Sequence, residues 1–188
     1  MHALRLSLVG TVILMLLGGL AGTTMARTDG STKVTGTVLS STSGAYGEFT
    51  EDGAIGEDWV GHGRGFGGSA TFEWSDSRLP SRADMMTNFD AYGDPADGDV
   101  GAVAVTTMWL LTDADGSWSG PWTGWCDEQN HCRGMVTLTG RGAYEGLYAI
   151  LTQQPREAAN GTVTDMYEGA ILAGEMPPVP EPLEPTTE

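Results

Sequence analysis

The sequence predicts an all-β, antiparallel domain built as a sandwich or a closed barrel. Short strand-like runs separated by turn residues recur along the chain, whereas no window combines a capped start, helical spacing of apolar residues and freedom from glycine. The 28 glycines are spread through the chain without a collagen period, which suits many tight turns. The length between the two chain ends, about 150 residues, is enough for one domain with its own core.

Nine segments are predicted as strands. They cover residues 33–40, 58–65, 70–74, 87–92, 100–112, 117–125, 133–139, 147–152 and 162–172. The dipeptides Asp115-Gly116 and Asn160-Gly161 fit two-residue hairpin turns, because both tolerate positive φ. Residues 94–98 (DPADG) form a further turn cluster. Closely spaced strands joined by short turns are typical of antiparallel sheets.

Two segments favour a barrel over a sandwich. Residues 100–111 (VGAVAVTTMWLL) are apolar on both faces, as expected for a strand that is covered on each side. Residues 59–68 alternate glycine with larger side chains, and a glycine stripe lets a strand bend sharply, as at a barrel corner. Strict alternation places Gly61, Gly63, Gly65 and Gly67 on one face of this strand, and His62, Arg64, Phe66 and Gly68 on the other.

The N-terminal segment predicts export. Residues 1–26 read as a Sec-type signal peptide, because Arg5 precedes an apolar run over residues 6–20 and Thr24 and Ala26 fit a small-x-small cleavage pattern. The alternative is an N-terminal membrane anchor, but the run is shorter than the ~20 residues of a spanning helix. We therefore expect a secreted protein without a stable membrane anchor after cleavage. A linker over residues 27–32, a single β domain over 33–175 and a disordered Pro/Glu-rich tail over 176–188 complete the expected organisation.

Cys126 and Cys132 are the two cysteines of the chain. In an exported protein such a pair most simply forms a disulfide, which should restrain the unfolded chain by roughly 2 kcal/mol. The alternatives are free or redox-active thiols, or a metal site that adds Asp127 and His131. Adjacent His131 and Cys132 would point to opposite faces of a strand, which disfavours the metal site. We expect neither a metal nor an organic cofactor.

Charge and histidine content exclude several function classes. A formal net charge of −16 repels phosphate backbones, so nucleic-acid binding is not expected. The chain has three histidines and one of them lies in the predicted signal, which leaves little material for acid–base or nucleophilic catalysis. The sequence leaves the oligomeric state open.

The residues expected to line a ligand cavity combine aromatic and polar character on predicted strands. They are His62, Arg64, Phe66, Trp74, Trp109 and Tyr148. A single flat sugar-stacking platform is not expected, because Trp118 and Trp122 share one strand face and Trp125 lies on the other.

Residues 140–147 (GRGAYEGL) resemble the G-x-G-x-Y-x-G corner of allene oxide cyclase and dirigent-like β-barrels, where it also follows a pair of long strands. Further pieces at residues 75–79, 116–120, 142–147 and 174–178 resemble a group of uncharacterised exported bacterial proteins. The resemblance implies an eight-stranded antiparallel barrel with a central cavity. It does not carry catalysis over, because no cyclase catalytic residue can be matched.

The function expected from these observations is non-catalytic. The barrel would bind a small apolar or aromatic ligand, or the protein would act as an extracellular interaction module. One alternative is a dirigent-like or cyclase/isomerase-like enzyme with Glu73, Asp76 and Glu145 as acid–base groups near the barrel mouth, which requires a carboxylate of raised pKa. Another is a structural surface protein whose barrel is filled by its own side chains.

Overall fold

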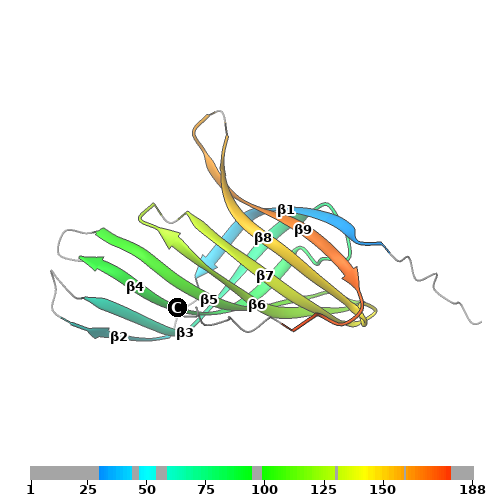
Figure 1. Cartoon of the computed structure of the whole chain (residues 1–188), viewed down its shortest axis with the longest axis horizontal. Coiled ribbons are helices and arrows are strands. Elements are labelled where there is room, and N and C mark those ends of the chain that lie inside the picture. The colour runs from blue at the N-terminus through cyan, green and yellow to red at the C-terminus, as the bar shows by residue number, and fades with distance from the viewer. Residues whose placement is uncertain are drawn as a thin grey trace, which may run out of the picture.

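A computed structural model describes residues 30–43, 47–53, 59–94, 99–129, 131–158 and 160–178. These residues form nine antiparallel strands and, within the same ranges, no helix (Figure 1). The strands are β1 (Thr32–Ser43), β2 (Glu48–Asp52), β3 (Val60–Trp74), β4 (Arg82–Asp94), β5 (Asp99–Thr112), β6 (Gly116–Asp127), β7 (Cys132–Gly142), β8 (Leu147–Glu157) and β9 (Val163–Ala173). The expected signal, residues 27–29 of the linker, the turn at 95–98 and residues 179–188 of the tail lie outside the described residues.

Eight strands close into a ring, and β2 is added beside it. The order is β1-β9-β8-β7-β6-β5-β4-β3, and the pairing of β1 with β3 closes the ring. This confirms the all-β antiparallel class and the eight-stranded closure. The ring is not evenly round about one axis, so a flattened barrel and a sandwich joined at its edges both describe it. We call the space that the ring encloses the lumen.

Two of the predicted strands, at residues 58–65 and 70–74, are a single strand in the structure, β3. It runs unbroken through the glycines that separate residues 58–65 from 70–74, because β4 pairs along most of its length and β1 and β2 pair with its two halves. A β-bulge at Gly65, where φ is +72°, shifts the register between Gly63 and Phe66. The bulge breaks the predicted alternation: Gly61, Gly63 and Phe66 face inward, and Gly67 faces outward. Strand β2 was not predicted, and its five residues are all exposed.

One end of the ring is closed by the connection between β3 and β4, residues 75–81. Leu79 of this segment is buried beneath the sheet, with 3% of its surface exposed. The indole N–H of Trp118 donates to the Arg78 carbonyl at 2.7 Å, and that of Trp74 donates to the Pro80 carbonyl at 3.0 Å. These bonds hold the segment across the end of the lumen, which we call the closed end.

The closed half of the ring contains the hydrophobic core. Its largest fully buried side chains are Trp118, Leu111, Leu138, Leu151, Ile171, Val34 and Val136. The turn between β7 and β8 packs over the same end, with Gly142 and Gly146 at φ of +70° and +78°. Tyr144 of this turn stacks on Trp118 and donates its hydroxyl to Asp113 at 2.6 Å. Thr32 pairs with Ile171, so β1 begins and β9 ends at this closed end.

Candidate functional site

The other half of the lumen holds a cavity of about 360 Å³. All eight strands of the ring contribute side chains to its wall. Most of these side chains are aliphatic or aromatic, among them Phe72, Phe89, Val105, Trp109 and Trp122. A volume of this size and an apolar lining are typical of small-molecule sites in proteins. Strands β2–β5 extend to one side of the mouth, and the β8–β9 hairpin rises from the other (Figure 1).

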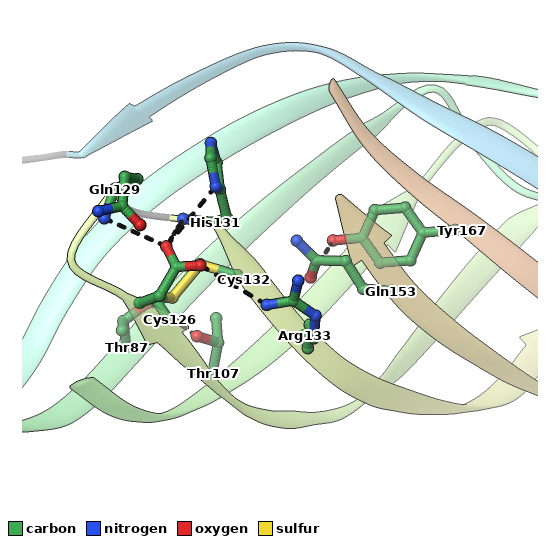
Figure 2. The surroundings of a disulfide bond; sticks show 10 residues. Thr87, Thr107, Cys126, Gln129, His131, Cys132, Arg133, Gln153 and Tyr167 are labelled. Carbon is green, nitrogen blue, oxygen red and sulfur yellow. Dashed lines mark hydrogen bonds and ion pairs between the residues drawn. A yellow bond between two sulfur atoms is a disulfide. The ribbon is translucent and has the colours of Figure 1, made fainter. Parts of the chain in front are cut away.

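One polar part of the cavity wall is a hydrogen-bonded pair of side chains. Tyr167 on β9 donates its hydroxyl to Gln153 Oε1 on β8 at 2.8 Å, beside the β6–β7 hairpin tip (Figure 2). Burial and the negative charge of Asp165 raise the pKa of Tyr167 well above its ordinary value, so the phenol stays protonated and acts as the donor. Because the amide oxygen is engaged by Tyr167, the amide nitrogen of Gln153 remains as a donor for other groups.

Two further polar features lie in the wall. Thr87 and Thr107 pair across β4 and β5, with their hydroxyl oxygens 3.0 Å apart. The indole N–H of Trp122 is buried and has no hydrogen-bond partner among the described residues. The Trp122 ring lies against Gly134, whose partner in the β7–β8 ladder is Gln153. The Trp122 N–H is packed against this part of β7 and is not open to the cavity, so the wall contains few polar groups.

The disulfide predicted from the sequence is present and borders the cavity. Cys126 and Cys132 are direct partners in the β6–β7 ladder, with their Cα atoms 4.0 Å apart (Figure 2). The Asp127 carboxylate accepts hydrogen bonds from the backbone N–H groups of Gln129 and His131, which stabilises the turn between the two cysteines. A disulfide at this position indicates an oxidising compartment.

Three of the six predicted lining residues face the lumen. Trp109 lines the cavity directly. Trp74 stacks on Phe72 with ring centroids 4.9 Å apart, on the side toward the closed end. Phe66 packs on Phe89, a wall residue, at 5.4 Å. Trp74 and Trp109 both contact the Tyr167 ring, whereas Phe66 belongs to a separate group of rings around Phe89.

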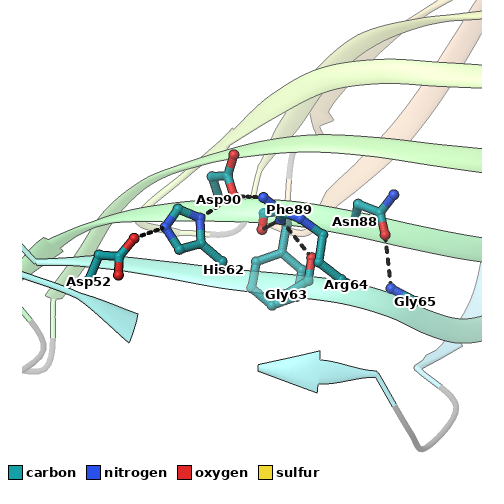
Figure 3. Close-up of polar contacts among 8 residues, drawn as sticks. All are labelled: Asp52, His62, Gly63, Arg64, Gly65, Asn88, Phe89 and Asp90. Atoms are coloured by element: carbon teal, nitrogen blue, oxygen red, sulfur yellow. Dashed lines mark hydrogen bonds and ion pairs between the residues drawn. The ribbon is translucent and has the colours of Figure 1, made fainter. Parts of the chain in front are cut away.

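The other three predicted lining residues, His62, Arg64 and Tyr148, lie on the outer face of the sheet, away from the cavity. His62 Nδ1 is 2.7 Å from Asp90 and its Nε2 is 3.2 Å from Asp52, so one imidazole links β2, β3 and β4 (Figure 3). Arg64 contacts the same Asp90 carboxylate at 2.6 Å. These bonds raise the pKa of His62 and lower that of Asp90, and the group stabilises the sheet extension rather than a ligand site.

The three carboxylates considered for catalysis lie at the closed end and not at the mouth, which corrects their expected position. Glu73 and Asp76 border an outer groove of about 510 Å³, and Glu145 lies in the exposed turn after β7. Arg78 contacts Asp76 at 2.6 Å and lowers the pKa of its carboxyl. A lowered pKa is the opposite of what a general acid near neutral pH requires.

Of the residues that line the cavity, Trp109 alone was predicted to do so, and the missed ones include the polar residues Gln153, Asp165 and Tyr167. Gln153 lies one residue beyond the predicted strand at 147–152. Tyr167 and Asp165 lie within the predicted strand at 162–172, where their alternation with Gly169 and Ile171 could have indicated an inward face.

Comparisons with known proteins show the fold and no more. No protein-family model and no curated protein matches the chain. A crystal structure of a protein of unknown function from the DUF3224 family of Shewanella oneidensis MR-1 is similar, with a TM-score of 0.52 and 17% sequence identity. The match covers 78% of this chain and 100% of the other. Within the described ranges, no helix is long and apolar enough to cross a membrane.

Proposed function

We propose that the protein binds a small, mainly apolar or aromatic molecule in the open half of its lumen, without catalysing a reaction. The observation that carries this proposal is the cavity of about 360 Å³ within the ring. A side-chain-filled lumen, as in a purely structural protein, would leave no such space. Ligand sites in proteins combine an apolar wall with a few polar groups that orient the ligand, and this cavity has both.

The amide of Gln153 supplies the polar contact that a ligand can use. Its oxygen accepts the hydrogen bond of Tyr167, so its nitrogen can donate to an acceptor atom on a bound molecule. The rest of the wall favours an apolar ligand body.

We place this binding outside the cell. The apolar run at residues 6–20 has the length and flanks of a cleaved export signal, and the disulfide fits an oxidising compartment. The cyclase-like enzyme has less support, because Asp76 is engaged by Arg78 and the candidate carboxylates lie outside the lumen. Among the described lining residues of the cavity, Asp165 is the one carboxylate, and that alternative would have to use it in place of Glu73, Asp76 and Glu145.

Native mass spectrometry of the protein purified from culture supernatant tests the proposal directly. We expect a fraction of the protein to carry an additional small-molecule mass that is released on unfolding. The neutral dye N-phenyl-1-naphthylamine should also bind with increased emission, because it would enter an apolar cavity.

A cavity-filling variant links the binding to the lumen. Val105→Trp places an indole ring in the cavity, while Thr106→Trp places the same ring on the exposed outer face of β5. We expect Val105→Trp to reduce dye binding at least tenfold and Thr106→Trp to leave it unchanged, with circular dichroism as the check on folding. Equal dye binding by both variants would place the dye elsewhere and refute the proposal.

A further inference from the structure

The wall of the cavity has an unbalanced charge. Among its described lining residues, Asp165 is the one carboxylate side chain, and none is Lys, Arg or His. Asp165 faces the lumen because it lies two residues before the inward-facing Tyr167 on β9. Asp165 and Tyr167 both line the cavity.

The protein does not neutralise this carboxylate itself. The nearest cation along the β8–β9 hairpin, Arg156, lies on the outer face and contacts Glu168 at 3.6 Å. In the described parts of the chain, Asp165 forms no ion pair with a Lys, Arg or His side chain. A carboxylate at the edge of an apolar cavity interacts more strongly with a cation than one in water, because the local dielectric constant is lower.

The aromatic part of the wall provides an apolar surface in the same cavity as Asp165. Phe72, Trp109 and Tyr167 form a triangle whose ring centroids are 5.1 to 5.8 Å apart, and only 2–4% of each residue is exposed, so most of each ring face is covered by packing. The rings therefore favour an apolar ligand body, and the preference for a cation rests on the Asp165 carboxylate. An anionic ligand would instead meet Asp165 with no basic side chain to compensate.

We propose that the ligand of this cavity is an organic cation, with its ammonium group beside Asp165 and its apolar body against Phe72, Trp109 and Tyr167. This inference rests on the proposed function, since it specifies the chemical class of the ligand in the same cavity. It excludes fatty acids and other carboxylates as preferred ligands.

Three probes of similar shape separate the charge from the apolar body. Benzyltrimethylammonium carries the cation, neopentylbenzene is its uncharged carbon isostere, and phenylacetate carries a negative charge. Their binding to the full chain is followed through the emission of Trp109 and Trp122, which line the cavity. At 0.15 M salt, where charges beyond about 8 Å are screened, we expect the cation to bind about tenfold more tightly than the isostere and phenylacetate not to bind.

A matched pair of variants then locates the effect. Asp165→Asn removes the inward charge, and Glu168→Gln removes one negative charge from the exposed outer face of the same strand. We expect Asp165→Asn to reduce cation affinity about tenfold and to leave neopentylbenzene binding unchanged, whereas Glu168→Gln changes neither. The comparison of the probes on the unmodified protein does not depend on either variant folding.

The outcomes separate the two proposals. If the cation and its isostere bind equally, the cavity binds ligands but the charge inference is overturned. If both variants lose cation affinity equally, the attraction comes from the net charge of the protein, and the inference is again overturned. If no probe, including the neutral dye, binds to the unmodified protein, the proposed function itself fails.

Discussion

The indole of Trp118 donates a 2.7 Å hydrogen bond to the backbone carbonyl of Arg78, which lies 40 residues earlier in the chain. This bond attaches the segment at residues 75–81 to β6 across the closed end of the ring. The ring thus has two unlike ends: one is packed around Trp118, and the other holds the cavity. Stability and binding can therefore be altered separately.

Trp118→Phe should destabilise the closed end. The change removes the bond to Arg78 and leaves a smaller ring in a fully buried position, so we expect the free energy of unfolding to fall by about 2 kcal/mol. Urea unfolding measures this. Trp125→Phe is the control, because Trp125 is 48% exposed on the outer face, and its effect should stay below about 1 kcal/mol. Equal losses in both variants would contradict the role of the Arg78 bond.

The bulge at Gly65 should tolerate alanine poorly. A Cβ atom would meet no neighbour within 4 Å at either Gly65 or Gly67, but φ is +72° at Gly65 alone of the two. We expect Gly65→Ala to lower the free energy of unfolding by about 1 kcal/mol, because the left-handed conformation disfavours a Cβ. Gly67→Ala should be neutral or slightly stabilising. Thermal unfolding of the two variants side by side tests this, and a neutral Gly65→Ala would show that the bulge is not strained by a Cβ.

Removing the disulfide should weaken the fold. The double variant Cys126→Ala/Cys132→Ala is expected to unfold with a free energy about 2 kcal/mol lower than the oxidised protein, because its unfolded chain is less restrained. Urea titrations with and without a reductant provide the measurement. The reductant should shift the midpoint of the unmodified protein and leave that of the double variant unchanged. No shift in the unmodified protein would mean that the bond contributes nothing to stability.

The outer cluster around His62 should make stability depend on pH. The bonds to Asp90 and, more weakly, to Asp52 raise the pKa of His62 above its ordinary 6.5. The protonated histidine therefore stabilises the fold below pH 6.5, and this contribution is lost as the pH rises through the raised pKa. The lowered pKa of Asp90 affects stability in a separate pH range. The ionised Asp90 stabilises the fold above its ordinary pKa of 3.8, and this contribution is lost as the pH falls below that value.

The test of this prediction compares urea midpoints between pH 5.5 and pH 8.5. The unmodified protein should lose stability toward the upper end of this range, and His62→Gln should lose less. Titration of the His62 imidazole by NMR should give a pKa above 6.5, lowered more by Asp90→Asn than by Asp52→Asn. A pKa at or below 6.5 would refute the prediction.

Local patterns predicted the class of fold well. The disulfide followed from Cys126 and Cys132 being the two cysteines of a chain expected to be exported, and the Trp118/Trp122 face followed from simple alternation along β6. The disulfide and the shared tryptophan face each involve residues that lie close together in the sequence, within the β6–β7 hairpin. The Asp76–Arg78 pair, at 2.6 Å, was also within reach of such reasoning because both residues belong to one turn. The resemblance to allene oxide cyclase and dirigent-like barrels stays a prediction.

The composition of the cavity wall could not be predicted in the same way. Alternation assigned Phe66 to the face of His62 and Arg64, but a single extra residue at Gly65 reverses the faces beyond it. Gln153 depends on how far β8 extends beside β9, a pairing between strands that the sequence of one strand does not encode. The exposed residues of β2 give no apolar pattern, so this strand is visible only through its pairing with β3.

The pairing of Thr32 with Ile171 has a practical consequence for handling the protein. The start of β1 and the end of β9 meet at the closed end. An affinity tag, fluorophore or surface linker attached at either of these two points is therefore joined to the molecule on the side away from the cavity. Immobilisation through such a linker would present the mouth to solution, so biosensor measurements could report ligand entry without interference from the support.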